Sequence, residues 1–194
     1  MTQRKERADA LRNREAVLAA ADELFARSQS PGGVSMDDIA AAAGVGKGTL
    51  FRRFGDRTGL IQAVVEQRIQ SLRHAVEEGP APLGPATPPA ERVPALLDAL
   101  LSFKLDNRHL TLALEETGSG SPYQAAHYAW WHRTLADTLQ RTPGGLRDSS
   151  YAAHALLAAT RADLVEHLVG QEQMAAEHMR AALAEFTAKI VGRT

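Results

Sequence analysis

A short segment of the chain concentrates residue types that contact nucleic acids. The stretch Ala43–Phe54 sets three glycines around Lys47 and ends with Arg52 and Arg53 close behind them. Arginine can donate two hydrogen bonds to the O6 and N7 atoms of guanine, and lysine binds phosphate as a point charge. Glycine lets the backbone approach a partner closely. This combination favours contacts with phosphates and base edges over proton or electron transfer.

The helical periodicity of this segment assigns its side chains to different faces. On an ideal helix Leu50 and Phe54 lie about 40° apart, so both can face a core. Arg52 then points away from that core, with Gly48 and Thr49 beside it and Arg53 to one side. We therefore expect Arg52 to read a base, Thr49 to offer a methyl or hydroxyl group, and Gly48 to permit close approach.

Phosphate contacts are expected from residues around this helix. Lys47, at the helix start, can reach a base or a phosphate, whereas Ser35, Arg53 and Arg57 are better placed for phosphate alone. A nucleotide-binding P-loop is disfavoured, because Ala41 stands where that motif needs glycine and Gly48 follows the lysine where it needs serine or threonine.

Four helices are expected to position these side chains. The pattern Ser35-Met36-Asp37-Asp38 has the spacing of a capping box and opens a short helix over 36–43. The second helix covers 47–54, and longer amphipathic helices are expected over 8–28 and 57–78. Helix, glycine turn and basic helix in that order are the layout of a helix-turn-helix DNA reader.

Composition predicts an all-α protein with two basic patches. The chain has 194 residues, 44% hydrophobic and 23% charged, with a net charge of −1 and no cysteine. Residues 1–14 and residues 47–57 each carry a net charge of +3, which suits a limited phosphate footprint on a near-neutral protein. No apolar run is long enough to cross a bilayer, so we expect a cytoplasmic protein with no membrane partner.

Five of the nine prolines lie in residues 79–90, which we take as a mobile boundary between two parts. The expected division is a DNA-binding domain over 1–57, a connecting helix over 58–78, the proline-rich loop over 79–90 and a second domain over 91–194. In the second domain we expect helices over 91–106, 108–116, 121–140, 149–168 and 172–191. The last two would be antiparallel neighbours joined at Gly170.

Aromatic residues gather in the second domain and suggest a pocket for a small apolar or planar ligand. Ordinary core packing is the better interpretation of any one of them alone. The expected ligand-binding residues are Phe103, Tyr123, His127, Trp130, Trp131, Asp163 and His167. Asp163 and His167 are spaced as possible metal ligands on one helix face, but no metal site, cofactor or catalytic constellation is predicted.

Residues 8–57 resemble the DNA-binding domain of the tetracycline-repressor (TetR) family of bacterial regulators. The resemblance rests on Ala16–Phe25, on Val34–Ala40, on Ala43–Phe51 with Phe54, and on Asp56-Arg57. It covers about a quarter of the chain and assigns no subfamily. Two positions depart from the family: Phe51 stands where a phosphate-contacting tyrosine is usual, and Gly46 stands where a serine or threonine cap is usual. We expect Phe51 to make only van der Waals contact.

The resemblance implies about nine helices, with a three-helix helix-turn-helix domain before a ligand-binding and dimerisation domain. It implies a homodimer formed by the last two helices, and a repressor that a small effector releases from a palindromic operator. Two alternatives remain open: a small all-helical enzyme for an aromatic substrate, and a DNA-binding regulator controlled by a protein partner. The effector, the operator and the regulated genes cannot be read from the sequence, nor can the choice between repression and activation.

Overall fold

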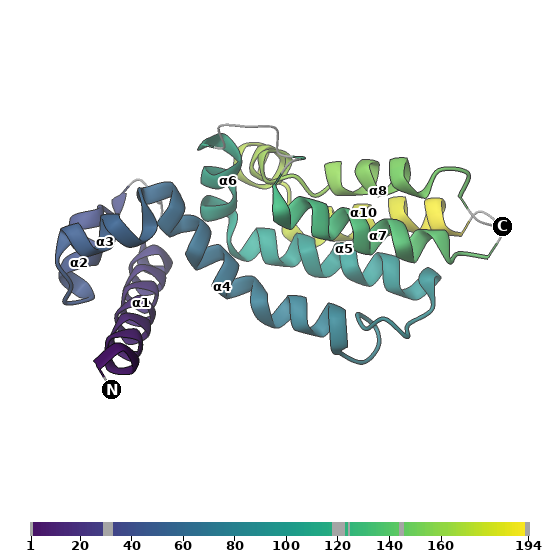
Figure 1. Ribbon diagram of the computed structural model, residues 1–194. Helices are drawn as coiled ribbons and strands as arrows, with labels where there is room; N and C mark the ends of the chain where they lie inside the picture. Colours follow the sequence, from purple (N-terminus) through teal and green to yellow (C-terminus); the bar gives the residue numbers. More distant parts are fainter. Residues whose placement is uncertain (1, 29–32, 118–122, 124, 144–145, 193–194) are drawn as a thin grey trace. The chain divides into compact units, whose positions relative to one another are not determined.

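The computed structural model describes residues 2–28, 33–117, 123, 125–143 and 146–192. All regular structure in these ranges is helical, which confirms the all-α prediction (Figure 1). The chain divides into two compact units, Met1–Arg68 and Ile69–Thr194. The division falls inside the expected connecting helix and not at the proline-rich segment. Within the described ranges, no helix is both long enough and apolar enough to span a membrane.

The first unit holds α1 (Thr2–Arg27), α2 (Met36–Ala42), α3 (Lys47–Phe54) and the first half of α4 (Arg57–Glu78). The bounds of α3 and α4 agree with those expected from the sequence. One apolar face of each helix is buried, and the fully buried positions include Ala21, Ile39, Leu50 and Leu60. Burial of these side chains fixes the rotation of α3 about its own axis, which decides the residues it exposes.

The second unit contains the rest of α4 and the later helices. These are α5 (Pro89–Asp106), α6 (Arg108–Thr117), α7 (Ala126–Gln140), α8 (Ser149–Ala158), α9 (Ala162–Val165) and α10 (Ala176–Val191). In this unit α7 packs along α8 and α10 packs along α5 (Figure 1). Its core includes Val93, Leu97, Leu135 and Leu156. The expected cap at Ser121-Pro122 lies outside the described residues.

The expected helix over 149–168 is wrong, because the chain leaves the helical path after Ala158. Buried Thr160 donates its hydroxyl to the Leu157 carbonyl at 2.9 Å, and the Ala162 N–H donates to Glu115 of α6 at 3.0 Å. These bonds replace helical ones at the break. The chain then runs through α9 into a π-helix over Glu166–Gln171.

The expected junction between the last two helices also differs. Gly170 lies inside the π-helix and does not join two helices. Gln173 adopts φ +57°, and α10 begins at Ala176, four residues later than predicted. The left-handed residue ends one helical path before the next begins.

The proline-rich segment belongs to the second unit, where it is packed against the core and is not a free linker. Leu83 packs against the apolar core and Thr87 is buried. Arg92 of α5 is buried and donates to Leu83 O at 2.8 Å, to Val76 O at 2.9 Å and to Thr138 Oγ1 at 3.2 Å. One guanidinium therefore ties the end of α4, the proline-rich segment and α7 to α5.

Candidate functional site

The turn between α2 and α3 is built by glycine geometry. Gly44 adopts φ +63°, a conformation that side chains with a Cβ avoid, and Val45 donates to Ala40 O at 3.0 Å to close the turn. Gly46 caps α3 with no side-chain hydrogen bond, as its departure from the family pattern implied. Its carbonyl accepts from Thr49 N and Leu50 N, so the helix starts on backbone bonds alone.

The capping box at the start of α2 is confirmed. The Ser35 hydroxyl accepts from the Asp38 N–H at 3.1 Å, and Asp38 Oδ2 accepts from the Ser35 N–H at 2.9 Å. The hydroxyl and then the N–H of Ser35 lower the pKa of the Asp38 carboxyl. Ser35 remains exposed at the N-terminal end of α2, where the first backbone N–H groups of the helix point outward.

The faces of α3 follow the expected pattern. Leu50 and Phe54 are buried, whereas Gly48 and Arg52 are exposed and Thr49 is half-buried. Phe51 keeps 39% of its surface exposed, so it offers an aromatic ring beside the basic residues. Arg52 makes no hydrogen bond or ion pair with any residue in the described ranges, which leaves its guanidinium available to a partner.

Arg53 and Arg57, which were expected to contact phosphates, make hydrogen bonds within the first unit. Arg53 donates through NH1 to the Ala10 carbonyl of α1. Arg57 donates through Nε to Val34 O at 3.2 Å, and its guanidinium lies 6.0 Å from the centre of the Phe25 ring. Both arginines therefore help to hold the helices around α3 together. The sequence pattern around α3 alone contains no signal for these tertiary bonds.

Lys47 also has a partner in this unit. Its Nζ lies 2.7 Å from Oδ1 and 2.9 Å from Oδ2 of Asp37, which stands in the first turn of α2. Both side chains are more than half exposed, so this is an ion pair at the surface. It joins the two helices of the helix-turn-helix across the glycine turn.

The aromatic residues predicted to bind a ligand do not share one site. Trp131 is buried in the core of the second unit, where it meets Trp130 edge to face. Trp130 donates through Nε1 to Glu77 at 2.7 Å, and the guanidinium of Arg73 lies 4.9 Å from the centre of its ring. Trp130 therefore joins α7 to α4, and Trp131 belongs to the core.

The other expected ligand residues are also dispersed. Phe103 is half-buried on α5, and His127 is exposed on α7. Asp163 pairs with Arg161 at 2.7 Å, and His167 pairs with Glu172 at 3.1 Å. Only Tyr123 of the predicted set lines the depression described next. No group of three or more possible metal ligands is found among the described residues.

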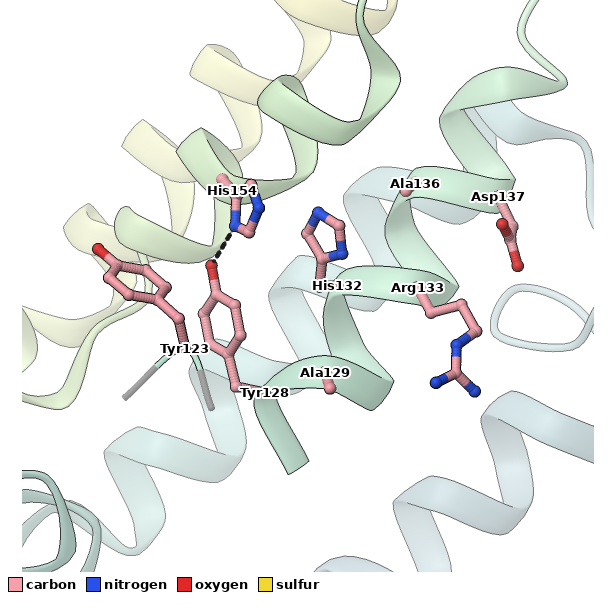
Figure 2. Close-up of a pocket in the computed structure, with 8 residues that line it drawn as sticks. All are labelled: Tyr123, Tyr128, Ala129, His132, Arg133, Ala136, Asp137 and His154. Carbon is pink, nitrogen blue, oxygen red and sulfur yellow. Dashed lines mark hydrogen bonds between the residues drawn. The ribbon is translucent and has the colours of Figure 1, made fainter. Parts of the chain in front are cut away.

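An open depression of about 410 Å³ lies between α7 and α8 (Figure 2). The rings of His132 and His154 stack at 3.9 Å between centroids, and Tyr128 bonds through its hydroxyl to His154 Nδ1 at 2.7 Å. Tyr123 meets Tyr128 edge to face at 5.2 Å. The lining residues are Tyr123, Tyr128, Ala129, His132, Arg133, Ala136, Asp137 and His154.

Part of this depression could have been predicted from the sequence. Tyr128 and His132 are four residues apart and so share a face of α7, but His154 comes from another helix. Partial desolvation first, and the neighbouring His132 second, lower the pKa of His154, whose side chain stays exposed. The site combines aromatic rings with the charged side chains of Arg133 and Asp137, which suits a small ligand with a planar body and a few polar groups.

Comparisons with known proteins agree with the first unit. The sequence profile of the family described as "Bacterial regulatory proteins, tetR family" matches residues 17–64. The HTH-type transcriptional regulator SAR0097 of Staphylococcus aureus is 34% identical over 76 residues, a match that covers 39% of this chain and 40% of that protein. The chain thus matches about two fifths of the length of this curated relative.

Solved structures resemble the chain over most of its length. A TetR transcriptional regulator from Rhodococcus sp. RHA1 has a TM-score of 0.65 at 19% identity, covering 94% of this chain and 97% of that one. NalD, described as the secondary repressor of the MexAB-OprM multidrug efflux pump in Pseudomonas aeruginosa, has a TM-score of 0.58 at 18% identity, with 93% and 96% covered. At these identities the likeness concerns the fold. The named relatives are regulators and not enzymes.

Proposed function

Because the chain belongs, through residues 17–64, to the tetR family of bacterial regulatory proteins, we propose that it is a ligand-responsive, homodimeric transcriptional repressor. It binds a palindromic operator by placing α3 in the major groove, and a small aromatic or apolar effector releases it. The observation that carries this proposal is the exposed edge of α3, where Gly48 and Arg52 stand outside a buried Leu50.

The exposed face of α3 supports a division of labour on DNA. Arg52 reads a base, most simply guanine through O6 and N7, while Thr49 and Phe51 make short contacts beside it. Ser35 and Arg57 contact phosphates at the edges of the groove and set the register of α3. Arg53 serves mainly to tie α3 to α1, because NH1 is bonded to Ala10 O.

Dimerisation through the last helices accounts for exposed apolar side chains on them. Tyr151 of α8 is 72% exposed and Phe186 of α10 is 45% exposed. Large apolar groups left in water are typical of protein interfaces when they lie together on one surface. A twofold pair of α3 helices about 34–36 Å apart then demands a palindromic site.

The effector site that we propose is the depression between α7 and α8. Four aromatic rings, from Tyr123, Tyr128, His132 and His154, provide flat surfaces for an aromatic effector. Binding there releases the operator if the effector prefers a conformation that DNA disfavours, and the coupling free energy equals the loss of operator affinity. We place this activity in the cytoplasm, where operator DNA lies.

The proposal is tested by selecting bound duplexes from a random pool and then titrating the selected site by fluorescence anisotropy. We expect an inverted repeat, two chains per duplex, and a loss of ~1–3 kcal/mol in binding free energy for Arg52→Ala, with relaxed preference at one base pair. Arg57→Ala should weaken all sequences alike and lower the salt slope by ~1 per subunit. If no duplex binds at low ionic strength, or if Arg52→Ala binds the selected site as tightly as the parent, the proposal fails.

The proposed effector site is tested by repeating this titration in the presence of a panel of small aromatic compounds. A compound that releases the operator should lose its effect in Tyr128→Ala, while the affinity of this variant for the operator stays unchanged. Release that persists in Tyr128→Ala would move the effector site elsewhere. An operator affinity that no small compound changes would favour control by a protein partner.

A further inference from the structure

The surface ion pair between Asp37 and Lys47 sits at the proposed DNA-reading edge. Lys47 is the first residue of α3, and in helix-turn-helix proteins the N-terminal residues of this second helix contact base edges. Asp37 approaches its ammonium group with both carboxylate oxygens, at 2.7 Å and 2.9 Å. The side chains of Lys47 and Asp37 are 60% and 64% exposed, so the pair faces solvent in the free protein.

This arrangement changes what Lys47 can do for DNA binding. A lone lysine is a mobile point charge that binds any phosphate and releases one counterion. With Asp37 attached, the pair carries no net charge, and the ammonium group is bonded to the carboxylate. Lysine has three donors, so at least one remains for a partner, and the ion pair restrains the position from which it donates.

We propose that Asp37 is a specificity-determining residue that turns Lys47 from a phosphate-binding cation into an oriented, neutral donor for a single acceptor on a base edge. The proposal rests on the DNA-binding function proposed above. An oriented donor forms a hydrogen bond only where the matching base presents an acceptor. On a random sequence it adds no affinity, because Asp37 cancels the charge that would attract the phosphate backbone. The acidic residue thereby lowers affinity for random DNA more than affinity for the operator.

The test compares the parent with Asp37→Asn on the selected operator and on a random duplex of equal length, from 50 to 200 mM salt. Asp37→Asn keeps the side-chain shape and frees the charge of Lys47. We expect the salt slope on random DNA to become steeper by about 0.9 for each Lys47, so by about 1.8 in a homodimer. From 50 to 200 mM salt, the ratio of the affinity of the variant for random DNA to that of the parent should therefore fall about tenfold. The preference of the variant for the operator over random DNA should be severalfold lower than that of the parent.

Two further variants separate this effect from a general change in charge. Glu23→Gln removes the same charge from another exposed ion pair in the first unit, the one with Arg27, and should leave slope and preference at the parent values. In a Lys47→Met background, Asp37→Asn should have no further effect on slope or preference. Melting curves show whether each variant remains folded.

The possible outcomes are distinct from those of the functional proposal. If the parent binds no duplex at low salt, the proposed function fails. If the parent binds its operator but Asp37→Asn keeps both the slope and the operator preference of the parent, the role of Asp37 is refuted. An effect of Asp37→Asn that persists in the Lys47→Met background also refutes it, because Asp37 would then act without Lys47.

Discussion

Arg92 holds the second unit together at a place where the helical hydrogen bonds run out. The carbonyl of Val76 would normally accept from the residue four positions on, but that residue is Pro80, which has no N–H. Arg92 donates to this carbonyl at 2.9 Å and to Leu83 O at 2.8 Å, while only 6% of its surface is exposed. Arg92→Met removes these donors and keeps most of the apolar stem.

The structure sets the size of the expected loss. Two carbonyls lose their donor at ~1–3 kcal/mol each. Thr138 Oγ1 loses a donor as well, but keeps its own bond to Thr134 O at 2.7 Å. Burial first, and the nearby Arg141 second, lower the pKa of Arg92, so removing the buried cation returns part of the loss. We expect the free energy of unfolding of the second unit to fall by ~2–4 kcal/mol.

Urea denaturation followed by tryptophan fluorescence measures this loss directly, because the two tryptophans of the chain, Trp130 and Trp131, both lie in the second unit. With a urea dependence of ~2 kcal/mol per M, the midpoint should fall by ~1–2 M. Arg141→Met is the matched control: it removes an exposed arginine that donates to Pro85 O at 3.2 Å, and should cost ~0.5 kcal/mol or less. A midpoint for Arg92→Met within ~0.3 M of the parent would refute the tying role of this guanidinium.

Three further predictions test the helix-turn-helix and the aromatic depression. Arg53→Met should destabilise the first unit by ~1 kcal/mol in thermal unfolding, through loss of the bond to Ala10 O, with an unchanged salt slope of DNA binding. A slope reduced by ~1 per subunit would instead assign Arg53 to phosphate. Phe51→Tyr should tighten binding to all duplexes by ~0.5–1.5 kcal/mol per subunit, because the added hydroxyl can donate a hydrogen bond to a phosphate at the edge of the ring. Equal affinities of parent and variant would show that the edge of the Phe51 ring does not face a phosphate. Because the pKa of His154 is lowered by partial desolvation and by His132, the folded state binds fewer protons than the unfolded chain as the pH falls through ~6.5. The free energy of unfolding should therefore fall more steeply between pH 7 and 5.5 in the parent than in His154→Gln, and equal slopes would contradict this.

The sequence predicted the helix-turn-helix well because its signals are local. The capping box at Ser35 and the left-handed glycine at Gly44 act within a few residues, and the apolar spacing of Leu50 and Phe54 fixes one helix face. Each signal is a backbone or periodicity requirement that tertiary structure reinforces. The bounds of α3 were therefore predicted correctly, as were the residues it exposes.

The second unit was predicted less well because its decisive contacts join distant residues. The helix break after Ala158 depends on Glu115, a residue of another helix, and the packed proline-rich segment depends on the buried Arg92. The depression brings His154 to residues of α7 that periodicity alone cannot pair with it. Trp130 and Trp131 were expected in a ligand site, but aromatic content does not distinguish a pocket wall from a core.

The most direct test of the account is the dependence of operator affinity on half-site spacing. With the operator obtained by selection, insertion of five base pairs between the half-sites turns one α3 to the opposite face of the duplex, since one turn is about 10–10.5 base pairs. We expect affinity to fall to the level of random DNA after this insertion and to recover partly after insertion of a full turn. An affinity that ignores the spacing would contradict a symmetric pair of α3 helices reading a palindrome.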